Sequence, residues 1–182
     1  RYTEPGSLSA AKSTEWHRIS LAVLAAGGDP ENIGGENLIA DGTYDRGKTA
    51  SLGRQGINGW IWGLITLDSM AYEIPDGAFY SRTDIITEII SKELTDGGFT
   101  LTGDVADPDI TAMAIQALAP YYNDENTYEI NGETVSVREV IDRATEKLSA
   151  MQTDDGDFLS WGTKNVESAD QVVVALCSLG ID

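Results

Sequence analysis

The chain has 182 residues, enough for one domain with a substantial buried core. Its 30 acidic residues outnumber its 12 basic residues and give a net charge of −18, which would repel a phosphate backbone or an anionic membrane surface. Because of this charge, we expect no nucleic acid as a partner. No apolar run reaches the roughly 18 residues that a membrane-spanning helix needs, so we also expect no direct insertion into a membrane.

Segments of two kinds alternate along the chain. Four are apolar on nearly every face, in chain order residues 19–28, 57–71, 110–122 and 171–180. Residues 83–94 and 136–151 carry apolar side chains on one face and charged side chains on the other, while residues 36–52 are less regular and predict a shorter outer element. A helix that is apolar all round is buried, whereas a one-sided helix keeps a solvated face.

This alternation predicts an all-α fold, a partial α/α toroid with apolar inner helices and amphipathic outer helices. The connectors repeat as well, because TDGGFTLTG precedes the third apolar segment and TDDGDFLSWG the fourth, roughly 60 residues later. Repeats of this size indicate stacked hairpins that share one core. We therefore expect a single toroid domain over residues 1–182. Because the chain begins with Arg1 rather than Met, we expect it to be part of a longer, multidomain protein.

Several of these motifs resemble a known family. LSAMQTDDGDFLSW resembles the repeat of terpene cyclases and protein prenyltransferases, and DGGFTLTGDVADPDITAMAIQALAPYY resembles the prenyltransferase/squalene-oxidase repeat of exported bacterial surface proteins. GRQGINGWIWGLITLDS and ESADQVVVALCSLGID are similar to the same group, and the resemblance runs from about Trp16 onward. It implies an extracellular or cell-surface location. The vitamin B12 carriers of animals use a similar toroid without catalysis, which implies a corrinoid-binding domain as one alternative.

Asp107 and Asp109 pose the question of acid catalysis. DPDITAM resembles the Asp-x-Asp-Asp motif of class II terpene cyclases, in which Asp109 would match the proton donor, but Ile110 replaces the last Asp. The same residues also fit a helix start, with Asp107 as the N-cap, Pro108 at the first helical position and Asp109 in the first turn. We expect the helix start and no catalytic residue. An isoprenoid-handling enzyme with Asp109 as its general acid is the alternative.

Other chemistry finds little support in the sequence. Cys177 and His17 are the sole cysteine and histidine, and neither lies in a motif of a nucleophilic dyad or a zinc site; Cys177 is expected to be a buried apolar side chain. TDDGD, residues 153–157, could offer oxygen ligands to calcium, but its spacing is more typical of a turn. We therefore expect no metal site and no cofactor.

The predicted topology would gather the N-termini of the inner helices on one rim, with spare backbone donors. This rim would carry aromatic, amide and acidic side chains, namely Asn58, Trp60, Asp107, Asp109, Trp161, Asn165, Glu167 and Asp170. The alternative for Trp60 and Trp161 is packing in the core. The rim set would suit a small polar ligand, a glycan or a peptide. We therefore interpret the chain as a non-catalytic ligand-binding or adhesion module, with neighbouring domains of the same chain as further partners.

Overall fold

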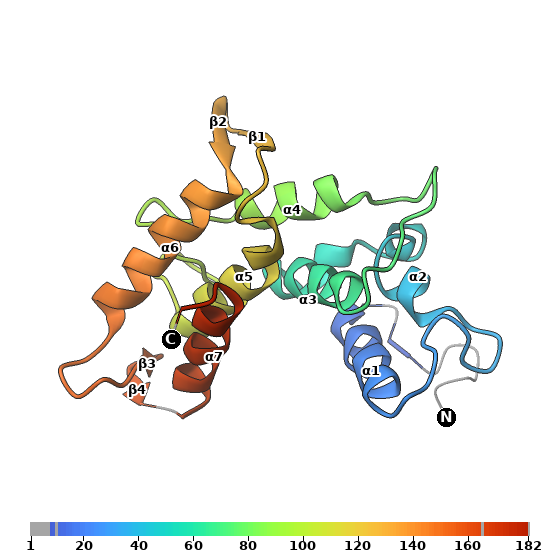
Figure 1. Ribbon diagram of the computed structural model, residues 1–182, viewed down its shortest axis with the longest axis horizontal. Helices are drawn as coiled ribbons and strands as arrows, with labels where there is room; N and C mark the ends of the chain where they lie inside the picture. The colour runs from blue at the N-terminus through green and yellow to red at the C-terminus, as the bar shows by residue number, and fades with distance from the viewer. Residues whose placement is uncertain (1–7, 10, 165, 182) are drawn as a thin grey trace. The chain divides into compact units, whose positions relative to one another are not determined.

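The fold consists of helices and short β-hairpins. The structure is a computed structural model that describes residues 8–9, 11–164 and 166–181. About 51% of it is helical, in seven α-helices accompanied by two small antiparallel sheets (Figure 1). The all-α prediction is therefore wrong, since the fold is mixed α/β and no toroid is indicated. The chain divides into unit 1 (Arg1–Ile86) and unit 2 (Thr87–Asp182), and each is described by itself.

Unit 1 is built on three α-helices and two short 3-10 helices. These are α1 (Ser13–Ala25), α2 (Leu38–Gly42), η1 (Arg46–Lys48), η2 (Leu52–Gln55) and α3 (Ile57–Asp68). α1 packs against both α2 and α3, and α3 also packs against η2. Gly59 permits this last contact, because a Cβ atom there would lie 1.9 Å from the carbonyl oxygen of Leu52. Ser13 on α1 donates a hydrogen bond to the same oxygen at 3.1 Å.

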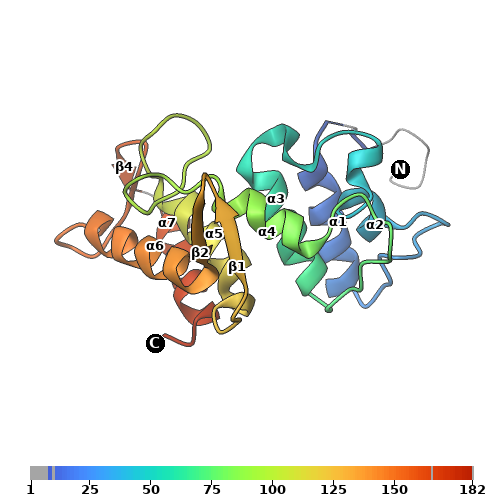
Figure 2. The ribbon, with the colours of Figure 1, turned by 90° about the horizontal axis from the view of Figure 1, so that it is seen from above.

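Unit 2 is centred on one buried helix. α5 (Pro108–Leu118) packs against α6 (Val137–Met151) and α7 (Val166–Ser178), as Figure 2 shows. The boundary between the two units falls within the residues of α4 (Arg82–Ile90). η3 (Ala119–Tyr121) extends α5 by one turn. α6 has the one-sided character expected from its sequence and starts with a capping box between Ser136 and Glu139. The sequence thus predicted the existence and type of the main helices of this unit.

Burial of the four apolar segments is uneven. Of α3 and α5 most residues are buried, whereas the buried residues of α1 are Ser13, His17 and Ser20. On α7, Val173 is 58% exposed, and Cys177, which we expected to be buried, is exposed. The prediction of four fully buried inner helices is therefore wrong for α1 and α7. Sequence periodicity identifies an apolar helix, but it does not show that a partner covers every face.

The two sheets are β-hairpins that the sequence analysis overlooked. β1 (Thr127–Ile130) pairs with β2 (Glu133–Ser136), and β3 (Leu159–Ser160) pairs with β4 (Thr163–Lys164). Each hairpin closes through two residues with positive φ, Asn131–Gly132 in the first and Trp161–Gly162 in the second. Two positive φ angles define a type I′ turn, for which Asn-Gly is the favoured sequence. Asn131–Gly132 is therefore a readable hairpin signal in a segment to which the sequence analysis assigned no element.

His17 is the most deeply buried titratable side chain of α1. Its Nε2 lies 2.7 Å from the carbonyl oxygen of Gly42, and because a carbonyl only accepts, Nε2 carries the proton. Within the described chain, Nδ1 has no hydrogen-bond partner. Burial lowers the pKa of His17 to about 4; the bond to Gly42 opposes this shift, and the charge of Arg46 adds to it. A protonated imidazole would bury a second N–H without an acceptor.

We predict that His17 makes unit 1 sensitive to acid. The pKa of His17 in the folded state lies below the ordinary histidine value of 6.5, so the stability that the neutral ring contributes is complete above pH 6.5 and is lost as the pH falls toward 4. His17→Gln removes this titration. The difference in unfolding free energy between wild type and H17Q should therefore shrink by on the order of 3 kcal/mol from pH 7 to pH 4. Urea unfolding across this range measures it, and parallel pH profiles for the two proteins would contradict the prediction.

Candidate functional site

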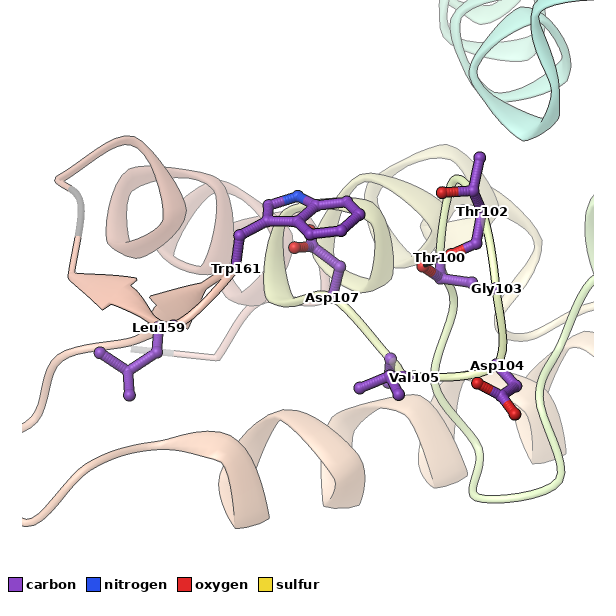
Figure 3. Close-up of a pocket in the computed structure, with 10 residues that line it drawn as sticks. Thr100, Thr102, Gly103, Asp104, Val105, Asp107, Leu159 and Trp161 are labelled. Atoms are coloured by element: carbon purple, nitrogen blue, oxygen red, sulfur yellow. Dashed lines mark hydrogen bonds between the residues drawn. The ribbon is translucent and has the colours of Figure 1, made fainter.

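A pocket of about 370 Å³ opens on unit 2 between the loop of residues 99–106 and the β3–β4 hairpin (Figure 3). We call it the Trp161 pocket. It is lined by hydroxyl, acidic, apolar and aromatic side chains and by two glycines: Thr100, Thr102, Gly103, Asp104, Val105, Ala106, Asp107, Leu159, Trp161 and Gly162. Of the eight side chains expected at the rim, Asp107 and Trp161 meet here.

Asp107 joins the two sides of this pocket. As the N-cap of α5 it accepts hydrogen bonds at Oδ1 from the amides of Asp109 at 3.0 Å and Ile110 at 3.2 Å. Its Oδ2 accepts a bond of 2.7 Å from the hydroxyl of Ser160 in β3. Asp107 is 9% exposed, and both of its oxygens are used in these contacts. The carboxylate therefore holds the start of α5 and the hairpin together through hydrogen bonds.

The 99–106 loop is closed at its base by α5. The amide of Asp107 donates to the carbonyl oxygen of Phe99 at 2.9 Å, and the amide of Phe99 donates to the hydroxyl of Thr111 at 3.0 Å. Gly98 lies directly against Ala106, since a Cβ atom at Gly98 would come within 2.4 Å of the Ala106 methyl group. The glycines of TDGGF thus allow a tight turn and the close contact with Ala106. Together they fix the position at which the loop begins.

Ion pairs also hold the hairpin that carries Trp161 in place. TDDGD forms a turn, in which Gly156 has a φ of +87° and its amide donates to the carbonyl oxygen of Thr153 at 2.8 Å. Lys164 of β4 pairs with Asp155 and, at 2.9 Å, with Asp157. These two carboxylates therefore already have a cationic partner. Among the described residues, no group of three or more His, Cys, Asp or Glu side chains could hold a metal ion.

Trp161 occupies an unfavourable backbone conformation. Its φ is +53°, and it is followed by Gly162 at +77° in the type I′ turn. A bulky residue in this left-handed region costs about 1 kcal/mol or more. Burial does not compensate, because the residue is 81% exposed. The equivalent position of the other hairpin holds Asn131, the residue type that tolerates this conformation. An exposed aromatic side chain held at such a cost is a reason to suspect function.

The other expected site residues lie elsewhere. Trp60 is 6% exposed in unit 1, with its ring edge-on to Tyr80 at 5.1 Å, so it is a core residue. Asn58 lies beside it on α3 and is half-buried. Glu167 and Asp170 are exposed on α7. Asn165 lies outside the described residues. Trp60, Asn58, Glu167 and Asp170 are not among the residues that line the Trp161 pocket.

Asp109 has the environment of a partly desolvated acid. Burial raises its pKa; a hydrogen bond with Ser168 opposes this shift, and the charges of Asp107 and Glu167 add to it. Its Oδ1 is buried and has no hydrogen-bond partner in the part of the chain that the structure describes. Asp109 is not among the residues that line the Trp161 pocket. It lies in the first turn of α5, behind the cap formed by Asp107, as the helix-start interpretation predicted.

Eight of the ten pocket residues were missed from the sequence, namely Thr100, Thr102, Gly103, Asp104, Val105, Ala106, Leu159 and Gly162. They lie in segments without helical or strand periodicity, so pattern analysis had no means of grouping them. The available signal was the dipeptide Trp161–Gly162 between short β-prone segments, which indicates a hairpin with an aromatic side chain at its tip.

None of the described helices has both the length and the apolar character needed to cross a bilayer. Comparison with models of protein families, with curated proteins and with solved structures finds no match for this chain. The resemblance noted from the sequence motifs therefore stays a prediction.

Replacing Trp161 tests whether its indole stabilises the fold. We expect Trp161→Asn to raise the free energy of unfolding by about 1 kcal/mol, because Asn tolerates the left-handed conformation and little packing is lost. The matched control is Asn131→Trp, which places Trp at the same turn position of the other hairpin and should lower the stability by a similar amount. Urea unfolding measures both changes. A clear loss of stability in W161N would show that the indole has a packing role.

A second substitution probes Asp109. Because the folded state raises the pKa of Asp109, its ionised carboxylate reduces stability at neutral pH, and this penalty vanishes as the pH falls toward the ordinary aspartate value of 3.8. Asp109→Asn should therefore raise the unfolding free energy at pH 7 modestly, because solvent screens the charge of a partly exposed carboxylate. The gain should shrink at pH 4. Lower stability of D109N at pH 7 would refute this account of the site.

Proposed function

We propose that this chain is a non-catalytic module that binds a small polar ligand in the Trp161 pocket. The observation that carries the proposal is the exposed indole of Trp161, held in a left-handed turn position that disfavours it. Natural sequences keep such local conflicts mainly where function requires them. The indole offers a ligand a large apolar face and one N–H donor.

The loop and the hairpin that form the pocket are held in place by hydrogen bonds, and this supports a binding role. The loop and the hairpin are both tied to the start of α5, the loop through Phe99 and Thr111 and the hairpin through Ser160 and Asp107. A pocket that is formed before the ligand arrives spends little free energy on ordering its side chains, which favours affinity. Its volume of about 370 Å³ lies at the lower end of the usual range for ligand sites, roughly 300–1,000 Å³. This size favours a small ligand over a corrinoid macrocycle.

The chemistry of the lining favours binding over catalysis. The ten lining residues include no histidine, lysine or cysteine, and the carboxylate of Asp107 is engaged by three donors. A nucleophile with an adjacent base, the usual basis of covalent catalysis, is therefore not assembled by these residues. If the ligand belongs to a cell or matrix surface, the same binding would serve adhesion. The extracellular or cell-surface location stays a prediction from the sequence resemblance.

The alternative of an isoprenoid-handling enzyme keeps one supporting observation, the raised pKa of the Asp109 carboxyl group. A carbocation intermediate requires a site that excludes water. The Trp161 pocket is open to solvent at its exposed indole and is not lined by Asp109. We therefore prefer the binding role.

The proposal is tested by a binding screen with the 182-residue chain. The probes are an immobilised panel of neutral glycans, acidic glycans, short peptides and amines, and the proteins are wild type, W161N and the double variant W161N/N131W. Wild type should bind at least one probe class. W161N should lose at least tenfold in affinity, about 1.4 kcal/mol. The double variant restores an exposed Trp in the other hairpin and should not recover binding.

Two outcomes would overturn the proposal. The first is a wild-type chain that binds no probe. The second is W161N binding every probe as tightly as wild type does. Recovery of binding in the double variant would attribute the signal to any exposed Trp rather than to the pocket, and would refute the site as well.

A further inference from the structure

We infer that the ligand of the Trp161 pocket is a neutral sugar ring, and that the pocket rejects sugars that carry a carboxylate. This inference rests on the proposed binding function and assigns its ligand class. It follows from four properties of the pocket: an apolar stacking surface, a rim of hydroxyl and carboxylate groups, the lack of a basic side chain among its lining residues, and its size.

The apolar surface matches one face of a pyranose ring. Figure 3 shows the indole of Trp161 reaching from the hairpin across the pocket, with Val105 and Leu159 on its lower side. Val105 is 75% exposed and Leu159 41% exposed, so three apolar side chains are presented to solvent at one place. A pyranose carries C–H groups on its ring faces, and these can cover an indole while the hydroxyl groups point outward.

Thr100, Thr102 and Asp104 lie on the loop opposite the indole, as Figure 3 also shows, whereas Asp107 lies beside it. Thr100 donates its hydroxyl hydrogen to the carbonyl oxygen of Thr102 at 3.1 Å, so its oxygen remains able to accept. Thr102 and Asp104 are exposed at the edge of the Trp161 pocket. A hydroxyl both donates and accepts, and a carboxylate accepts from neutral hydroxyl groups in strong, charge-assisted bonds. This combination suits a ligand with several neighbouring hydroxyl groups.

The charge of the site excludes acidic sugars. No Lys, Arg or His is among the ten lining residues, so a ligand carboxylate would find no cation there. It would instead face Asp104, on a chain whose net charge is −18. Like charges at close range are unfavourable, particularly where solvent is partly displaced. Uronic and sialic acids should therefore bind more weakly than neutral sugars of the same size.

A cationic ligand fits the pocket less well. Cages for organic cations combine several aromatic faces, whereas Trp161 is the one aromatic side chain among the lining residues. Asp107 also offers little to a cation, since its charge is met by the N-terminal amides of α5 and by the hydroxyl of Ser160. Asp104 alone remains as an exposed carboxylate on the rim.

Size and exposure suggest how such a sugar is presented. About 370 Å³ accommodates one or two rings, and the exposed indole leaves the pocket open toward further rings of a longer chain. A single ring with few contact atoms should bind with a dissociation constant on the order of millimolar. Oligosaccharides are therefore the better probes.

The test is an NMR titration of the 15N-labelled 182-residue chain, followed through the indole N–H signals of its four tryptophans. The signal of Trp161 is identified by its loss in W161N. The probes are neutral oligomers of glucose, mannose, galactose and N-acetylglucosamine, with oligomers of glucuronic and galacturonic acid and sialylated lactose as their acidic counterparts. At least one neutral oligosaccharide should shift the Trp161 signal and saturate, and its acidic counterpart should bind at least tenfold more weakly.

Asp104→Asn tests the origin of this discrimination. It keeps the size of the side chain and removes its charge, so the affinity ratio between neutral and acidic oligomers should fall at least threefold. The matched control is Asp124→Asn, which removes the same charge from an exposed position of unit 2 that does not line the pocket and should leave the ratio unchanged. Equal ratios in wild type and D104N would overturn the charge argument.

The remaining outcomes separate this inference from the proposed function. If peptides or amines bind in a Trp161-dependent manner and neutral sugars do not, the sugar inference fails and the binding function stands. If acidic oligomers bind as tightly as neutral ones, the inference fails as well. If no probe shifts the Trp161 signal and W161N behaves as wild type in every assay, both proposals fall.

Discussion

Three segments of unit 2 meet at Asp107. Its carboxylate caps α5 by accepting from the amides of Asp109 and Ile110, and it also accepts from the hydroxyl of Ser160 in β3. Its backbone amide closes the 99–106 loop by donating to the carbonyl oxygen of Phe99. A buried carboxylate is costly unless its lone pairs are satisfied, and here the helix start and the hairpin supply the donors together. The position of the hairpin is therefore tied to the position of α5, and the Trp161 pocket lies between the hairpin and the 99–106 loop.

The pocket has two parts of different character: a base whose polar groups are all hydrogen-bonded, and the hairpin tip at Trp161, whose backbone conformation is strained. At the base, Asp107, Ser160 and Thr111 form a connected set of hydrogen bonds with little exposure. At the tip, Trp161 adopts a conformation that glycine or asparagine would adopt more easily, and it packs against little. Agreement between local preference and overall fold is the rule in foldable sequences, and departures from it concentrate at functional sites. This contrast singles out the tip as the place where binding, rather than stability, determines the residue.

Sequence reasoning succeeded where a residue acts on its near neighbours. The cap at Asp107, the proline that follows it and the one-sided pattern of α6 depend on contacts within a few residues, and the structure confirms them. It failed where the answer depends on distant partners. The toroid was wrong because apolar periodicity does not show what covers a helix, and α1 and α7 keep apolar side chains partly exposed.

The candidate site was predicted only in part for the same reason. Asp107 and Trp161 were named from the sequence, but the hydrogen bond that brings Ser160 to Asp107 spans 53 residues and has no local signature. The threonines and Asp104 lie in an irregular loop whose course is decided by its two ends. The hairpin that carries Trp161 has strands of two residues, which is too short for strand periodicity to be detected.

The division between base and tip has a consequence for how this surface could change over time. Asp107 and Ser160 cannot be exchanged one at a time without leaving a buried polar group unpaired. The side chain at position 161 has no such constraint, because it projects into solvent from a turn that is held in place by other residues. Recognition can therefore diversify at the tip while the scaffold beneath it is retained, much as variable loops are carried on a constant framework.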